Sequence, residues 1–101
     1  MKRALLTLFA LATLSAPVLA DQALATAKNC MACHAIDKKV VGPAFKEVAA
    51  RYANDKGAAD RLAAKIVKGG GGSWGALPMP ANNQVSPDEA KRLATWVLSL
   101  K

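Results

Sequence analysis

The chain has 101 residues, of which 14 are Lys or Arg and 7 are Asp or Glu, so its formal charge at pH 7 is +7. That length allows at most one small domain, whose own hydrophobic core is marginal unless something else stabilises it. The basic residues form no long run and are not interleaved with aromatic residues, which argues against a nucleic-acid-binding protein.

The N-terminus is typical of a secretory signal peptide. Two basic residues precede an uncharged apolar run over residues 4–14, and a stretch that we expect to break the helix follows and ends in Ala20. The run is shorter than the roughly 20 apolar residues of a membrane span. We predict that residues 1–20 are a signal peptide cleaved after Ala20; the alternative is an uncleaved anchor helix. Cleavage removes two basic residues and no acid, so the single domain over residues 21–101 has 81 residues and a formal charge of +5.

Two helices are predicted in the first half of this domain, with a loop over residues 34–42 between them. Asp21 is a suitable N-cap for a helix over residues 22–29. Pro43 is a residue favoured in the first turn of a helix, and it precedes a second helix over residues 44–52.

A third helix is predicted over residues 58–68, followed by a long loop over residues 69–85. The loop starts with four glycines, which lose too much backbone entropy to form regular structure, and prolines on both sides of Met79 exclude a helix there. Ser86 opens the last helix with the sequence of a capping box, and Trp96 lies on its apolar stripe. Because no alternating strand pattern is present, we predict an all-α fold of four to five short helices.

The segment Cys30-Met31-Ala32-Cys33-His34 matches the C-x-x-C-H pattern of covalent haem attachment. Two thiols three residues apart on one turn can each bond a vinyl group on the same porphyrin edge. The adjacent His34 is then directed at the iron. The sequence therefore predicts one covalent haem c for the chain.

Three other chemistries share parts of this motif. A disulfide between Cys30 and Cys33 suits an oxidising compartment, but the position of the only histidine in the chain, directly after the second cysteine, is then a coincidence. A thioredoxin-like redox pair needs a βαβ setting that the sequence lacks. Zinc needs four ligands, and the motif offers three.

Met79 is the candidate for the second axial ligand, because the chain has no other histidine. It lies far downstream, in a loop that can pass over the opposite haem face. A His/Met pair is the axial set of electron-transfer cytochromes c and raises their reduction potential. With both axial positions filled, no position is open for oxygen or peroxide, which predicts an electron carrier and not an enzyme. The alternative is that Met79 only fills space in the loop.

From residue 28 to residue 100 the chain resembles the short bacterial class I cytochromes c of the cytochrome c-551 type. The matching segments are NCMACHAID, VVGPAFKEVAARY, KIVKGG, SWGALPMPAN and SPDEAKRLATWVLSLK. The resemblance implies the class I cytochrome c fold, with short helices wrapped around one haem. It also implies that Cys30 and Cys33 hold the haem by thioethers and that His34 and Met79 ligate the iron.

Four further residues receive roles from the resemblance. Pro43 would accept a hydrogen bond from the outward N–H of His34. Trp74 looks like the indole donor to a haem propionate, or else packs in the core. Lys65 stands where such cytochromes often carry a cation near a propionate, or else is a solvated helix lysine. Asn82 looks like the asparagine that orients the methionine sulfur, or else forms a turn.

The chain also departs from this family at several positions. Ala76 and Ala81 stand where relatives often have proline, and Ser73 replaces a common valine. We therefore expect a looser Met79 loop. Phe45 stands where a tyrosine is frequent, which removes one possible hydrogen bond.

These features together predict a monomeric one-electron carrier in the periplasm of a Gram-negative bacterium. Its partners would be respiratory redox proteins, such as a periplasmic nitrite reductase, a peroxidase or a terminal oxidase, that dock weakly at the haem edge. Four lysines near the attachment motif either steer acidic partners or form an ordinary solvated face: Lys28, Lys38, Lys39 and Lys46. Two alternative functions are a permanent haem subunit of an enzyme complex and a gas sensor in which Met79 is displaced.

Overall fold

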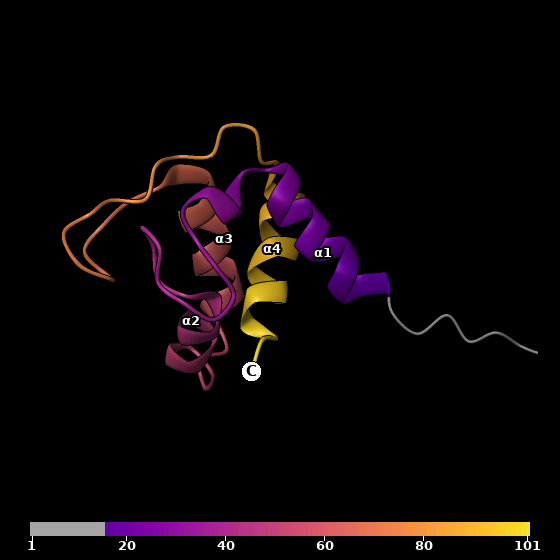
Figure 1. The fold of residues 1–101 in the computed structure, drawn as a ribbon, viewed down its shortest axis with the longest axis horizontal. Helices are drawn as coiled ribbons and strands as arrows, with labels where there is room; N and C mark the ends of the chain where they lie inside the picture. Colours follow the sequence, from indigo (N-terminus) through magenta and orange to yellow (C-terminus); the bar gives the residue numbers. More distant parts are fainter. Residues whose placement is uncertain (1–15) are drawn as a thin grey trace, which may run out of the picture.

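The computed structural model describes residues 16–101, which form four α-helices and one short 3-10 turn (Figure 1). In chain order the elements are α1 (Ala16–Ala27), the 3-10 turn η1 (Cys30–Ala32), α2 (Phe45–Arg51), α3 (Ala58–Lys68) and α4 (Pro87–Leu98). Residues 16–101 contain two isolated bridges and no β-strand, so the predicted all-α class is confirmed. None of these described helices is long and apolar enough to cross a membrane.

Helix α1 begins six residues before the predicted start at residue 22. Pro17 lies in its first turn, where a missing N–H costs nothing and a fixed φ suits the helix, so the expectation of a helix break is wrong here. Asp21 lies inside the helix and does not cap it. Its carboxylate instead accepts a hydrogen bond from the Arg92 side chain of α4 at 2.9 Å. The apolar run over residues 4–14, which is part of the predicted signal peptide, lies outside the described residues.

The bounds of α2 and α3 agree closely with the sequence prediction. Helix α3 has the predicted bounds and ends at Gly69, whose φ of 72° is readily adopted only by glycine. Helix α2 starts at Phe45, one residue later than predicted, because Ala44 has an extended ψ of 140° and serves as the N-cap. It also ends one residue earlier, since Tyr52 is its C-cap.

Helix α4 starts with the predicted capping box. The Ser86 hydroxyl accepts a hydrogen bond from the backbone N–H of Glu89 at 3.1 Å, and the Ser86 N–H donates to the Glu89 carboxylate at 3.0 Å. Two N–H groups that have no partner within the helix are thereby satisfied. The sequence signature and the observed start of α4 therefore agree.

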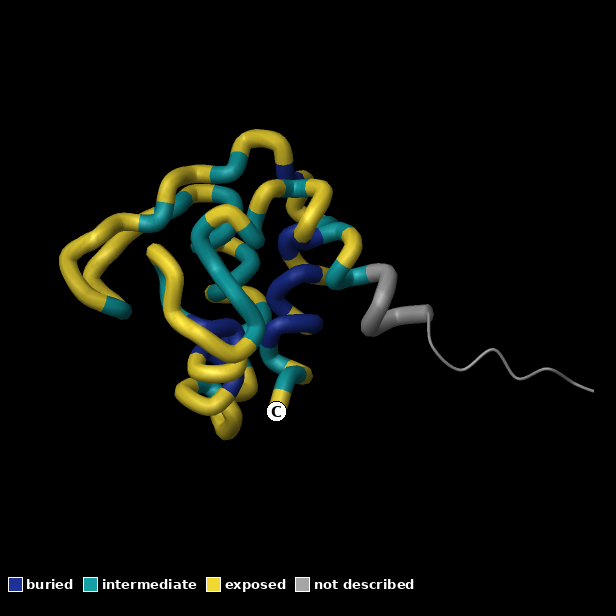
Figure 2. Tube along the Cα trace, in the orientation of Figure 1, coloured by how far each residue is buried: buried dark blue, intermediate teal, exposed yellow. Residues whose placement is uncertain are grey.

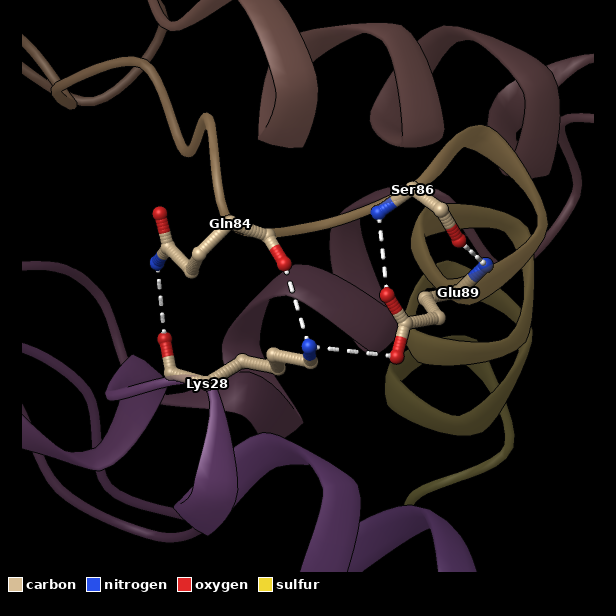
Figure 3. Close-up of polar contacts among 4 residues, drawn as sticks. All are labelled: Lys28, Gln84, Ser86 and Glu89. Carbon is tan, nitrogen blue, oxygen red and sulfur yellow. Dashed lines mark hydrogen bonds and ion pairs between the residues drawn. The ribbon is translucent and has the colours of Figure 1, made fainter.

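A network around Lys28 joins the end of α1 to the start of α4 (Figure 3). The Lys28 amino group donates to the backbone carbonyl of Gln84 at 3.0 Å and lies 3.3 Å from the Glu89 carboxylate. In return, the side-chain amide of Gln84 donates to the Lys28 carbonyl at 3.0 Å. The chain just before the cysteine motif is thus fixed to α4.

The hydrophobic core lies around α4, which packs against α1, α2 and α3 (Figure 2). Trp96 is 3% exposed, as the apolar stripe predicts, and its ring meets that of Phe45 edge to face at 5.5 Å. The buried cluster consists of Ala25, Phe45, Val48, Val85, Ala90, Leu93, Trp96 and Val97. In Figure 1, the long segment between α3 and α4 extends out beyond this core before it returns to α4.

Candidate functional site

One tight turn brings the two cysteines of the motif together. Asn29, with a left-handed φ of 66°, ends the first helical segment, and η1 follows. The backbone N–H groups of Cys33 and His34 both donate to the Cys30 carbonyl, at 3.2 and 3.0 Å. Both thiols are free and half-buried, and burial raises the pKa of the Cys30 thiol above its ordinary value. The turn therefore presents two unpaired thiols next to the histidine.

His34 is held by one hydrogen bond at the edge of its ring and by one aromatic ring stacked on its face. Its Nδ1 lies 2.8 Å from the Pro43 carbonyl oxygen, and its ring stacks on that of Phe45 with centroids 4.8 Å apart and planes 20° from parallel. A carbonyl can only accept, so Nδ1 carries the proton and Nε2 keeps its lone pair. The predicted contact between Pro43 and His34 is therefore present, and the ring is left with one nitrogen able to bind a metal.

Position 42 needs a glycine because the His34 ring leaves no space for a side chain, and not because of its backbone conformation. It has no positive φ, but a Cβ at this position would lie 2.5 Å from Cε1 of His34 and 2.9 Å from Nδ1. Its N–H also donates to the Cys33 carbonyl at 2.7 Å. The close approach of the chain at Gly42 thus lets the ring reach Pro43.

A cavity of about 960 Å³, its open mouth included, lies between α2, α3 and the long loop. Six of the residues predicted from the sequence line it: Cys33, His34, Pro43, Lys65, Trp74 and Met79. Its other lining is mainly apolar, with Val48, Leu62, Ile66 and Val97 among the residues.

Two of the predicted site residues are not among those that line this cavity. Cys30 packs against the hydrophobic core. Asn82 donates from its side chain to the Ile66 carbonyl at 2.8 Å, and its backbone N–H donates to the carbonyls of Ile66 and Val67 at 3.2 and 3.3 Å. Within the described residues, the side-chain hydrogen bonds of Asn82 go to Ile66, Pro80 and Gln84, and none goes to Met79. Asn82 thus ties the loop to the end of α3.

Met79 is fixed through its backbone. Its N–H donates to the Gly70 carbonyl at 2.8 Å, and its carbonyl accepts from the Gly70 N–H at 2.9 Å. Gly69 comes so close that a Cβ there would lie 2.6 Å from the Met79 carbonyl oxygen. The glycine run thus forms one side of a tight pairing that places Met79 at the cavity.

Lys65 and Trp74, the two residues that the resemblance assigns to a haem propionate, both line the cavity. Lys65 is half-buried, and its amino group lies close to Gly70. Trp74 is also half-buried, and the Arg51 guanidinium carbon lies 3.4 Å from the centre of its ring. Arg51 was not predicted as a site residue, nor was the stacking of Phe45 on His34, because no sequence spacing links residues that meet only in the fold.

Comparison with known proteins identifies close relatives of this chain. The family model described as cytochrome c matches residues 20–101. Cytochrome c-551 of Azotobacter vinelandii is 62% identical over 74 residues, which are 73% of this chain and 89% of the relative. Cytochrome c-551 of Stutzerimonas stutzeri is 52% identical over 105 aligned residues that cover 100% of both chains. The crystal structure of wild-type Nitrosomonas europaea cytochrome c552 matches with a TM-score of 0.77 at 52% identity, over 79% of this chain and 99% of that one.

Proposed function

This chain belongs to the cytochrome c family, and we propose that it shuttles single electrons between respiratory redox proteins in the periplasm, with His34 and Met79 as the axial ligands of its haem iron. Its relatives are small electron-carrier cytochromes with haem c, and the chain is one of them. The proposal concerns the axial ligand pair, the cellular compartment and the redox partners. One observation carries the proposal: Cys33, His34 and Met79 line a single, mainly apolar cavity.

The cavity suits a haem attached through the cysteine motif. Bound haem iron supplies a reversible one-electron couple. Cys33 lines the cavity beside His34, and Cys30 lies one tight turn away. The two thiols hold the haem by thioethers in this proposal, and the mainly apolar lining excludes water from its faces.

The two proposed axial ligands come from separate elements with different supports. His34 keeps its Nε2 free while Nδ1–H donates to Pro43, and such a bond fixes the ring and raises its basicity as a ligand. Met79 is supported by the backbone pair with Gly70. A thioether ligand favours the ferrous state and raises the potential. With both residues bound, no axial position remains for oxygen or peroxide.

Lys65 and Trp74 are the proposed partners of a haem propionate. Both line the cavity on the side of the long loop. Within residues 16–101 the Lys65 amino group makes no ion pair, so its charge is free to act on an anion. Asn82 supports Met79 in this proposal by holding the loop against α3, in place of a bond near the sulfur.

Partner docking is proposed at the cavity mouth, by a weak and transient contact of less than about 1,200 Å². Val41 and Leu77 line the mouth and are 53% and 74% exposed. Lys38, Lys39 and Lys46 are exposed and can steer acidic partners. Lys28 is excluded from this set because its amino group is engaged by Gln84 and Glu89.

The proposed location in the periplasm rests on the signal-peptide pattern at residues 1–20. The family match begins at residue 20, which supports a domain boundary there. Cleavage after Ala20 would leave residues 21–27 of α1 on the mature protein. Haem attachment to a chain of this kind follows export.

The proposal is tested on the full chain expressed in a bacterium that attaches haem in its periplasm. We expect an intact mass equal to residues 21–101 plus one haem, and a redox titration that fits a one-electron couple. Replacing both cysteines, Cys30→Ala with Cys33→Ala, should abolish covalent haem. A purified wild-type chain that carries no covalent haem would refute the proposal.

A further inference from the structure

The loop over residues 71–78 has little internal structure of its own. Its base is closed by the backbone pair of Gly70 and Met79, but within residues 71–78 the described structure has no backbone–backbone hydrogen bond. Gly72 and Gly75 have φ values of 91° and 116°, and nothing lies within 4 Å of either Cβ position. Most of this loop is exposed (Figure 2). Its position over the cavity must therefore be set from outside.

Arg51 makes the only hydrogen bond that the described structure gives to residues 71–78. Its guanidinium donates to the backbone carbonyl of Ser73 and at the same time lies over the Trp74 ring, 3.4 Å from the ring centre. Arginine can do both at once because its planar group stacks on an aromatic face while the N–H groups at its edge donate.

Arg51 itself belongs to α2, which contributes Phe45 and Val48 to the cavity lining. It is the last residue of α2, whose Phe45 and Val48 are buried in the core. Phe45 stacks on His34. The Arg51 side chain therefore connects the helix that supports one proposed iron ligand to the loop that ends at the other.

Building on the proposed function, we infer that Arg51 is a positioning residue that holds the loop over the cavity and so protects the bond of Met79 to the iron. Loss of this tether raises the fraction of molecules in which the loop is displaced. A ligand that competes with Met79 binds only those molecules, so its apparent affinity follows that fraction. Arg51 acts on the sixth position without touching the iron or Met79.

The test is imidazole binding to the ferric holoprotein, followed by the loss of the sulfur-to-iron absorption band. In Arg51→Ala we expect an apparent affinity about fivefold to tenfold higher than in the wild type, from the lost stacking and hydrogen bond together. Arg51→Lys should behave like Arg51→Ala, because an ammonium group lacks the planar fork that makes both contacts.

Two control variants isolate the tether from other effects. Ser73→Ala keeps the backbone carbonyl that accepts the bond, and Arg92→Ala removes an arginine of α4 that pairs with Asp21 and does not line the cavity. The apparent imidazole affinity of both variants should stay within about twofold of the wild-type value.

Equal imidazole affinity in wild type and Arg51→Ala would overturn the inference, and so would wild-type affinity in Arg51→Lys. Failure of the proposed function is recognised separately, because the wild type itself would then lack covalent haem or the sulfur-to-iron band.

Discussion

Nδ1 of His34 lies 2.8 Å from the carbonyl oxygen of Pro43, nine residues further along the chain. Because that oxygen can only accept, the bond fixes both the orientation of the ring and its tautomer. Nε2 is left as the ligand atom, in a cavity that Met79 also lines. Several consequences of this arrangement can be measured.

The first prediction concerns Gly42, beside this bond. In Gly42→Ala the new methyl group would overlap the His34 ring at 2.5 Å, so the ring must turn and its bond to Pro43 must lengthen. We expect the free energy of unfolding of the holoprotein to fall by about 1–3 kcal/mol and the reduction potential to rise, because the histidine becomes a less basic ligand.

Gly57→Ala is the matched control for that variant. A Cβ at Gly57 would meet the end of the Arg61 side chain at 2.6 Å, and that flexible end can move aside. In chemical denaturation the free energy of unfolding should change by less than about 0.5 kcal/mol, and the reduction potential should be unchanged. A Gly42→Ala protein that matches this control in both measurements would show that the ring is not confined as the structure indicates.

The second prediction separates backbone strain from steric overlap in the glycine run. Gly69→Ala combines a φ of 72° with a Cβ only 2.6 Å from the Met79 carbonyl oxygen, whereas Gly72→Ala has a φ of 91° and open space. Both should destabilise the protein by about 1 kcal/mol or more through strain. Only Gly69→Ala should also weaken the sulfur-to-iron band, and equal band intensities in the two variants would argue against the pairing at Met79.

The third prediction concerns Asn82, which ties the loop to α3. Asn82→Ala removes the donor to the half-buried Ile66 carbonyl, and we expect a loss of about 1 kcal/mol in unfolding free energy. Asn83→Ala is the control, because Asn83 is exposed and none of the side-chain hydrogen bonds of the described residues involves it. If the two neighbouring variants unfold at the same denaturant concentration, Asn82 does not hold the loop.

The fourth prediction is a pH dependence at Glu89. The hydrogen bond from the Ser86 backbone, followed by contacts from Lys28, holds the pKa of the Glu89 carboxyl below its ordinary value of 4.5. A lowered folded-state pKa stabilises the fold above the unfolded-state pKa, and this contribution is lost as the pH falls through the folded-state pKa.

Glu89→Gln keeps an oxygen for the capping box and removes the charge beside Lys28. The wild type should therefore have the larger free energy of unfolding near neutral pH. Its advantage over Glu89→Gln in this free energy should shrink as the pH is lowered from about 6 to about 3. Denaturation curves of both proteins across that range provide the measurement. An advantage that stays constant, or that grows toward acid, would contradict the lowered pKa.

Much of the fold could be predicted because its signals are local. The capping box at Ser86 and the glycine at the end of α3 depend on neighbouring residues only, and both elements start or end as predicted. The predicted start of α1 is wrong because Asp21 resembles an N-cap and Pro17 a helix breaker, although the first turn of a helix accepts proline.

The residues of the site were predicted better than their contacts. The cysteines, His34 and Met79 are marked by motif, but the partners of other side chains depend on the tertiary fold. Lys28 is expected from the sequence either to steer acidic partners or to lie on a solvated face, and it instead meets Glu89, 61 residues away in the sequence. No sequence pattern marks Arg51 as a site residue, because its partners Ser73 and Trp74 are brought to it only when the loop crosses the cavity.

Carbon monoxide binding to the ferrous holoprotein tests the central claim, His34/Met79 ligation in an electron carrier, most directly. The wild type should show a low-spin spectrum, with the sulfur-to-iron band in its ferric form, and no spectral response to the gas. Met79→Ala, with its sixth position open, should bind the gas and so serve as the positive control. If the wild type binds the gas as readily as Met79→Ala does, Met79 is not a firm ligand, and the chain binds gases at an open iron site.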